Sequence, residues 1–303
     1  MSISGAQSQD RPEAESGDTP GDTIEDIILE NDMRGVSELR SHLPPDFCTQ
    51  AAQYILDHPG NVIIVTGFYI LSAGKHETDG PPGAIAIGNA LEALGRSVTY
   101  VSDVHTTPML RDWLGDSLGD RARVVEYPIS DIDSSRKTAA DMLSQLDPSL
   151  LISIERCGRT KDDLYLNMRA ADITQHTARL DYLFEHGIPS VGIGDGGNEI
   201  GMGNLADVIP GVDRLPDDPA IAKVDRLVLA SVSNWGGYGL VTALSRLVGR
   251  DLMPTAEEDE RLIRSMVDAG AVDGTTGENK YYVDGFTLEH NSAVLERLRG
   301  LVG

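Results

Sequence analysis

The chain reads Gly192-Ile193-Gly194-Asp195-Gly196-Gly197-Asn198-Glu199-Ile200-Gly201-Met202-Gly203-Asn204 directly after residues 188–191, a run that is typical of a buried strand. Six of these thirteen residues are glycine, which permits positive φ and a close approach of the backbone to a ligand. Asp195, Asn198 and Glu199 add carboxylate and amide oxygens, which suit a hard cation or an ammonium group. A purely structural turn needs fewer glycines, so we expect a functional loop on a rigid scaffold.

Short apolar runs alternate with amphipathic segments around this loop. Such β–α alternation predicts an α/β fold, a mostly parallel sheet with helices on both faces in a Rossmann-like three-layer sandwich. Ligands of these sheets bind at the carboxyl ends of the strands. We predict strands at residues 62–66, 97–101, 123–127, 150–154, 190–193 and 226–231, and helices from Thr23 onward and at residues 45–57, 84–94, 109–114, 134–145, 175–185, 238–248, 257–269 and 288–301.

The composition of the N-terminal segment and the two cysteines indicate the domain organisation and the cellular compartment of the protein. Residues 1–22 are polar and predict a disordered acidic tail, whereas residues 23–303 predict a single α/β domain. The chain has no apolar run of about 18 residues, and its polar N-terminus argues against a secretory signal. Cys48 and Cys157 form neither a disulfide framework nor a zinc spacing. We therefore expect a cytoplasmic protein without membrane partners, and a homo-oligomer is compatible with this composition.

The charge balance excludes one class of partner. The formal net charge is −23, from 48 acidic and 25 basic residues. Nucleic-acid binding requires clustered lysine and arginine, so we expect no nucleic-acid partner. Aspartate supplies 31 of the acids and lysine only five of the bases. This pattern favours a halophilic protein, because concentrated salt screens such self-repulsion; an ordinary acidic protein is the alternative.

Polar side chains also follow the strand predicted at residues 62–66. Lys75, His76, Glu77 and Asp79 precede Gly80 and two prolines that restrict the path of the loop. The loop resembles a phosphate loop only superficially, because its glycine spacing is wrong and His76 stands where a hydroxyl would hold magnesium. A site for proton chemistry and a solvated turn both remain open here.

Two further strand exits carry binding groups. Arg156 and Arg159 follow the strand predicted at 150–154, and paired guanidinium donors could clamp a carboxylate. A surface ion pair with Glu155 is the alternative for either arginine. Cys157 has no activating base nearby in sequence, which predicts an inert thiol. Asn234 follows the strand predicted at 226–231, and the free amides of a helix start could hold an anion there.

Two motif tests separate the competing functions. Gly192, Gly194 and Gly197 satisfy G-x-G-x-x-G, but no acidic residue ends the next strand, so the nicotinamide hypothesis fails its second requirement. Residues 194–199 also resemble the GDGxND loop of haloacid-dehalogenase-type phosphohydrolases. That family needs a D-x-D nucleophile directly after an early strand. Asp131-Ile132-Asp133 has the letters, but Pro128 interrupts its approach.

The loops together resemble the D-glutamate cyclase C-terminal-like family. The matching stretches lie between about residues 60 and 240, and the long glycine motif with Glu-Thr-Asp-Gly-Pro-Pro-Gly is specific. They are Glu77-Thr78-Asp79-Gly80-Pro81-Pro82-Gly83-Ala84, Ile154-Glu155-Arg156 with Gly158-Arg159, Tyr165-Leu166-Asn167-Met168-Arg169, Gly192 through Asn204, and Ser233-Asn234-Trp235-Gly236. The resemblance implies a hydro-lyase that converts D-glutamate to 5-oxo-D-proline and water.

This reaction implies a role for each candidate residue. Asp195 and Glu199 would hold the substrate ammonium group or a metal ion, Mg²⁺ or Mn²⁺. Arg156 and Arg159 would bind the α-carboxylate. His76 or Glu77 would transfer protons, with Lys75 as an electrostatic helper. The remaining substrate-binding candidates are Asp79, Gly80, Gly194, Gly196, Gly197, Asn198 and Asn234, of which the glycine amides and Asn234 would stabilise an oxyanion.

Two other classes remain open from the sequence. A Mg²⁺-dependent phosphohydrolase would depend on Asp131. A non-catalytic protein that binds an amino acid or a nucleotide would use the same cleft at the strand ends without proton chemistry.

Overall fold

The computed structural model describes residues 22–115 and 122–302. Its central sheet has six parallel strands in the order β5-β4-β1-β6-β7-β8. Their bounds lie within two residues of the predicted ones: β1 Val62–Thr66, β4 Val98–Ser102, β5 Ala122–Glu126, β6 Leu150–Ile154, β7 Ser190–Gly194 and β8 Arg226–Leu229. Strands β1, β6 and β7 are buried along their whole length, because helices cover both faces of a parallel sheet.

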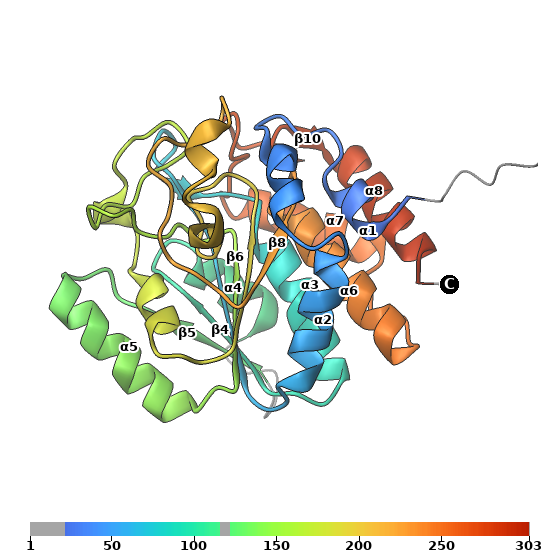
Figure 1. Cartoon of the computed structure of the whole chain (residues 1–303), viewed down its shortest axis with the longest axis horizontal. Helices are drawn as coiled ribbons and strands as arrows, with labels where there is room; N and C mark the ends of the chain where they lie inside the picture. The colour runs from blue at the N-terminus through green and yellow to red at the C-terminus, as the bar shows by residue number, and fades with distance from the viewer. Residues whose placement is uncertain (1–21, 116–121, 303) are drawn as a thin grey trace, which may run out of the picture.

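Helices flank the sheet as predicted (Figure 1). Helices α2, α3 and α6 pack together on one face, and α5 lies on the other face against the 3₁₀ helix η3. Helices α1, α7 and α8 pack around α6 and α3, so both ends of the described chain join one hydrophobic core. The helix bounds are α1 Ile24–Ile28, α2 Phe47–Asp57, α3 Pro81–Ala93, α4 Thr107–Leu114, α5 Ile132–Leu146, α6 Ser233–Val248, α7 Ala256–Asp268 and α8 Leu288–Gly300.

The predicted helix at residues 175–185 is wrong. The segment forms two 3₁₀ turns, η2 Thr174–His176 and η3 Leu180–Glu185, separated by extended backbone at Thr177. The carbonyl of Ala178 accepts a hydrogen bond from Arg156 Nη2 at 2.8 Å. Tertiary bonding to this carbonyl replaces the helical bond that the local pattern favoured.

Two short hairpins were not predicted. Strands β2 Tyr69–Ile70 and β3 Lys75–His76 form one after β1, and β9 Tyr282–Val283 and β10 Phe286–Thr287 form the other before α8. Backbone hydrogen bonds join Val272 to His76 at the end of the first hairpin and to Thr78 just after it. Thr78 Oγ1 also donates to the carbonyl of Tyr282 in the second hairpin. The C-terminal hairpin is thereby held beside the loop that follows β1.

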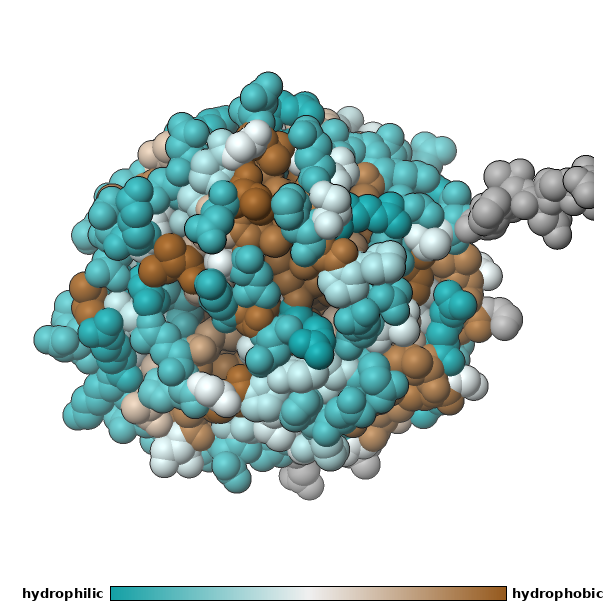
Figure 2. Space-filling model, in the orientation of Figure 1, coloured by the Kyte–Doolittle hydropathy of each residue, from teal (hydrophilic) through white to brown (hydrophobic). Residues whose placement is uncertain are grey.

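Hydrophilic residues cover most of the face shown in Figure 2, and apolar side chains are visible between them. None of the helices in residues 22–115 and 122–302 is both long and apolar enough to span a bilayer. The predicted tail lies outside the described residues except for Asp22, which pairs with Arg297 at 2.7 Å.

Candidate functional site

The order of the strands fixes where a ligand site should lie. Strand β1 connects to β4 on one side, whereas the chain crosses back from β5 to β6 on the other side of β1, and a crevice forms at the carboxyl ends beside such a switch point. The loops after β1, β6 and β7 meet there with the start of α6. They and the C-terminal hairpin bring together six carboxylates, each at most 6% exposed: Glu77, Asp79, Glu155, Asp195, Glu199 and Asp284.

Glu199 organises the glycine loop from within. Its Oε1 accepts hydrogen bonds from the backbone amides of Asp195 at 2.9 Å and Gly196 at 2.6 Å. A Cβ at Gly196 would lie 2.6 Å from Met168 Sδ, so a larger residue there would require the Met168 side chain to move. We predicted that the amides of residues 194–197 face a substrate oxyanion. Those of Asp195 and Gly196 instead donate to Glu199.

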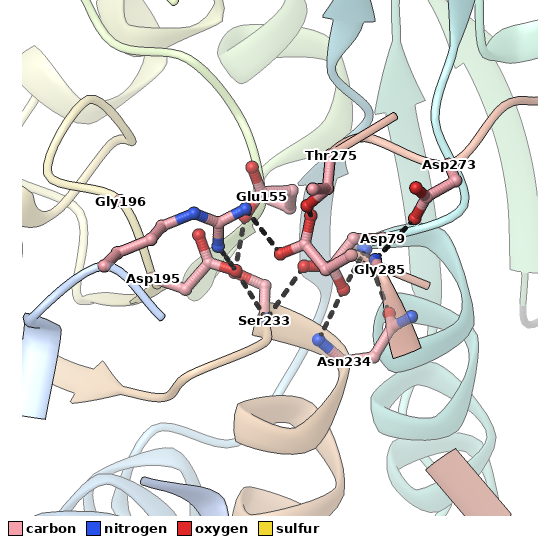
Figure 3. A network of polar contacts seen from close by, with 12 residues as sticks. Asp79, Glu155, Asp195, Gly196, Ser233, Asn234, Asp273, Thr275 and Gly285 are labelled. Carbon is pink, nitrogen blue, oxygen red and sulfur yellow. Dashed lines mark hydrogen bonds and ion pairs between the residues drawn. The ribbon is translucent and has the colours of Figure 1, made fainter. Parts of the chain in front are cut away.

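Asp79 and Asn234 cap two helices reciprocally (Figure 3). Asp79 accepts from the amides of Ser233 and Asn234 at the start of α6, at 2.9 and 2.8 Å. Asn234 Oδ1 accepts from the amides of Gly80 and Gly83 at the start of α3, both at 2.9 Å. Capping side chains satisfy amides that have no partner inside a helix. Asn234 thus joins two helix starts, and its Nδ2 also donates to the carbonyl of Thr78 at 3.2 Å.

Arg34 supplies a positive charge that sequence reasoning missed. Its Nη1 lies 2.8 Å from Asp195 Oδ2, and its Nη2 lies 2.6 Å from Asp284 Oδ2. The turn that carries it is held by Asp32, whose carboxylate accepts from the amides of Arg34 and Gly35. No local pattern connects this turn to the strand ends. Asp284, by contrast, had a signal, because Asp284-Gly285 between apolar residues is typical of a hairpin turn.

Burial makes several of these carboxyl groups weak acids. Desolvation, and then the neighbouring carboxylates, raise the pKa of Glu77, Asp79 and Glu155 well above the usual range. Desolvation also raises the pKa of Asp195 to about 6 and that of Asp284 to about 7, although Arg34 opposes both shifts. The cluster therefore retains protons near neutral pH or requires additional positive charge.

A cavity with a volume of about 480 Å³ opens onto this cluster. Carboxylates line its inner part, and exposed arginines stand at its edge. Its polar lining includes Glu77, Glu155, Asp195, Asn167, Asn198, Arg34, Arg169 and Arg214, and its apolar lining includes Met33, Phe68, Ile70 and Met168. Such a cavity has one acidic and one basic region.

Arg156 and Arg159 do not line this cavity. Arg156 is buried, donates to the carbonyls of Gly67 and Ala178, and pairs with Asp103 at 2.6 Å. Arg159 pairs with Asp181 at 2.6 Å and with Glu185. The structure therefore does not form the expected carboxylate clamp from these two side chains. The arginines that do line the cavity are Arg34, which the sequence analysis did not identify, Arg169 and Arg214.

Lys75 and His76 also lie away from the carboxylate cluster. They line a second cavity of about 270 Å³, together with His105 and Asp112. Burial lowers the pKa of His76 to about 4. Glu77 lines the main cavity instead, so the structure separates its side chain from those of Lys75 and His76.

Two other predictions concern reactive groups outside the cavity. Cys157 is buried, and burial raises the pKa of its thiol, which agrees with the inert thiol we expected. Asp131 caps α5 and accepts from the amide of Ser134 at 2.9 Å. It follows β5, which β4, β1 and β6 separate from β7. The two halves of a haloacid-dehalogenase site are therefore not brought together.

The solved structures that resemble this chain are only distantly similar to it. A short-chain dehydrogenase/reductase from Serratia marcescens is 14% identical, with a TM-score of 0.28, over 64% of this chain and 69% of its own. An actinorhodin polyketide ketoreductase variant is 13% identical, with a TM-score of 0.30, over 82% and 91% of the two chains. Likeness at this level supports no argument about function.

Sequence comparison is more informative. The chain is 30% identical over 280 residues to the mitochondrial D-glutamate cyclase of Homo sapiens. The match covers 80% of this chain but 46% of that protein, so the chain spans about half the length of this relative. Residues 24–299 match the family described as D-glutamate cyclase-like, C-terminal. This match includes every element that builds the carboxylate cluster, and the chain belongs to the D-glutamate cyclase-like C-terminal family.

Proposed function

We propose that this chain is a hydro-lyase that binds D-glutamate and converts it to 5-oxo-D-proline and water. The observation that carries the proposal is the two-ended cavity. Glutamate has one ammonium group and two carboxylates. Its ammonium group suits the inner region at Glu77, Glu155 and Asp195, whereas its carboxylates suit Arg169 and Arg214 at the exposed edge.

The reaction needs a group that moves a proton twice. The α-amine must lose a proton before its nitrogen attacks the γ-carboxyl carbon. A C–N bond then forms, a C–O bond breaks, and the departing oxygen leaves as water after it takes up protons. A carboxyl group with a pKa of about 6, as for Asp195, can both accept and return a proton near neutral pH. Glu77 is a second candidate at the same wall of the cavity.

The decisive experiment measures product directly. Purified protein is incubated with D-glutamate and separately with L-glutamate in high salt, with and without Mg²⁺ or Mn²⁺, and 5-oxoproline is identified by chiral chromatography. Formation of 5-oxo-D-proline supports the proposal. Tight binding of glutamate without product over long incubation would instead identify a non-catalytic binding protein. Phosphate release from a generic ester would identify the phosphohydrolase.

Removal of the arginines at the cavity edge should weaken substrate binding more than it slows turnover. In an Arg169→Ala/Arg214→Ala variant we expect KM for D-glutamate to rise by about tenfold, because charge-assisted contacts to the carboxylates are lost. Steady-state kinetics at fixed ionic strength measures the change. Arg246→Ala is the control, since Arg246 is exposed at the end of α6 and away from the cavity. Equal KM values for the two variants would show that Arg169 and Arg214 do not contribute to substrate binding.

The carboxylate cluster should make the fold less stable as pH rises. Asp195 and Asp284 have pKa values of about 6 and 7, above the value of about 3.9 for an unfolded chain. The folded state therefore binds more protons between about pH 4 and 7, and this contribution is lost as pH rises through the folded pKa values. Each group contributes at most about 1.4 kcal/mol per pH unit.

Urea unfolding at pH 5 and pH 7.5, in high salt with a chelator, tests this expectation. We expect the wild-type protein to be more stable at pH 5. In Asp284→Asn the difference between the two pH values should shrink, because asparagine does not titrate. An unchanged difference in this variant would contradict the assignment.

A further inference from the structure

The main cavity has an apolar side that free glutamate does not use. Its apolar lining includes Met33, Phe68, Ile70, Leu71 and Met168. Two of these large side chains remain exposed beside the cavity, Met33 at 46% and Leu71 at 40%. Ligand sites combine such apolar surface with a few polar groups that orient the ligand. Glutamate consists of charged groups on a short chain, so the apolar side suits an additional, apolar part of a larger ligand.

This apolar side is supported from behind by a small core of its own. Phe68 is buried in a cluster with Cys157, Tyr165 and Ile173, and Ile70 packs against that cluster. The cluster is separate from the large core around the sheet. Side chains that are already packed in place lose little freedom when a ligand binds to them. The structure therefore presents a preformed apolar wall to the cavity.

The volume of the cavity also exceeds that of glutamate. Glutamate has about ten non-hydrogen atoms, and each occupies less than the volume of about 30 Å³ that a water molecule takes in the liquid. Glutamate therefore fills at most about 300 Å³ of a cavity of about 480 Å³. The remaining space accommodates several more non-hydrogen atoms.

The charges of the inner region disfavour an ionised γ-carboxylate beside the amine. In a reactive geometry the amine nitrogen lies about 3–3.5 Å from the γ-carbon, so both groups contact the same wall of the cavity. That wall carries Glu155 and Asp195, whose oxygens lie within 4.8 Å of each other, and Glu77 (Figure 3). Arg34 is already paired with Asp195 and Asp284. Like charges repel at this range, whereas a neutral γ-amide avoids the repulsion.

We propose that this site acts on γ-amides of D-glutamate that carry an apolar amine, and that it releases 5-oxo-D-proline and the free amine. This substrate class rests on the proposed function, because the same α-nitrogen attacks the same γ-carbon. The C–N bond of the lactam forms, and the C–N bond of the amide breaks. The substrate ammonium group loses two protons, and the departing amine takes up both and leaves as an ammonium ion. No water or other co-reactant is consumed.

A comparison of three substrates tests the proposal on the full chain. They are γ-D-glutamyl benzylamide, D-glutamine and D-glutamate, in the same concentrated salt and the same Mn²⁺ concentration. Chiral chromatography measures 5-oxo-D-proline and benzylamine, after subtraction of reactions without protein. We expect kcat/KM for the benzylamide to exceed that for D-glutamine by at least about tenfold, because its ring is buried against the apolar wall. D-glutamine, which is neutral at the γ-position, should exceed D-glutamate.

A variant of the apolar wall separates this contact from the chemistry. In Met33→Ser/Leu71→Ser we expect the ratio of kcat/KM for the benzylamide to that for D-glutamine to fall by about fivefold, because apolar contact area is lost. Leu247→Ser is the matched control, since Leu247 is also 40% exposed but lies on α6, outside the cavity lining. Its ratio should equal that of the wild-type protein. Thermal unfolding shows whether each variant is folded.

The possible outcomes distinguish this substrate class from the proposed function. Cyclisation of D-glutamate without release of benzylamine would overturn the amide class and leave the proposed function intact. Release of benzylamine without turnover of D-glutamate would support the amide class and overturn D-glutamate as the substrate. Absence of product from all three compounds would overturn both. An unchanged ratio in the folded Met33→Ser/Leu71→Ser variant would also contradict binding of the amine at the apolar wall.

Discussion

Replacing Asp195 with asparagine should reduce kcat for cyclisation by about 10³-fold, within the range for loss of a positioned acid–base group. Asp195 lies where the main cavity meets the cluster of buried carboxylates. Asparagine keeps an oxygen that can accept from the amide of Ser233, now 3.2 Å from Asp195 Oδ2. It cannot accept a proton from the substrate ammonium group. The measurement is single-turnover formation of 5-oxo-D-proline.

The expected loss has to be separated from a change in fold. Arg34 would retain its contact with Asp284, so we expect the Asp195→Asn variant to unfold cooperatively, as the wild-type protein does. Asp131→Asn is the control for removal of a carboxylate, because Asp131 is exposed and caps α5. Near-normal turnover in folded Asp195→Asn would remove Asp195 from the mechanism and leave Glu77 as the remaining candidate for proton transfer.

Replacing Asn234 with alanine should destabilise the fold by about 2–4 kcal/mol, the sum of a lost helix cap and a buried amide left without an acceptor. That amide belongs to Gly83, because the amide of Gly80 also donates to Asp79 Oδ1 at 2.9 Å and Pro81 and Pro82 have no amide hydrogen. Asp79 would still accept from the amides at the start of α6, but the contact of Asn234 with α3 would be lost. Each kcal/mol lowers the Tm of a chain of this size by about 2–4 °C.

Thermal unfolding in high salt measures this effect. Asn89→Ala is the matched control, because Asn89 is exposed on α3 and a surface substitution changes stability by at most about 0.5 kcal/mol. If Asn234→Ala melted within 1–2 °C of the control, the reciprocal caps would contribute little to stability, and the residue would return as a candidate for substrate contact.

The strands of the sheet and the loops that follow them could be predicted, because both depend on patterns within short segments of sequence. Apolar runs such as Val62–Thr66 and Leu150–Ile154 must be buried, and regular alternation with amphipathic helices leaves a parallel sheet as the simplest arrangement. Parallel strands end at one edge, so the carboxylates at positions 79, 155 and 195 had to lie near one another. The error at residues 175–185 arose because a tertiary contact to Ala178 outweighed the helical pattern.

The roles of the arginines could not be predicted in the same way. Arg156 and Arg159 stand at a strand exit exactly as a carboxylate clamp would, yet Asp103 and Asp181, which are distant in sequence, engage them. Arg34 and Asp284 come from opposite ends of the chain and meet only because α1 and the C-terminal hairpin pack beside the same loops.

The sequence by itself determined the class of fold, the edge of the sheet that holds the site, and the glycine loop that surrounds Glu199, because periodic burial and backbone freedom are properties of short segments. Only the tertiary structure decided which charges meet there. Ion pairs such as Arg34 with Asp195 depend on atoms within a few ångströms of each other, and that proximity is created by packing between segments far apart in the chain.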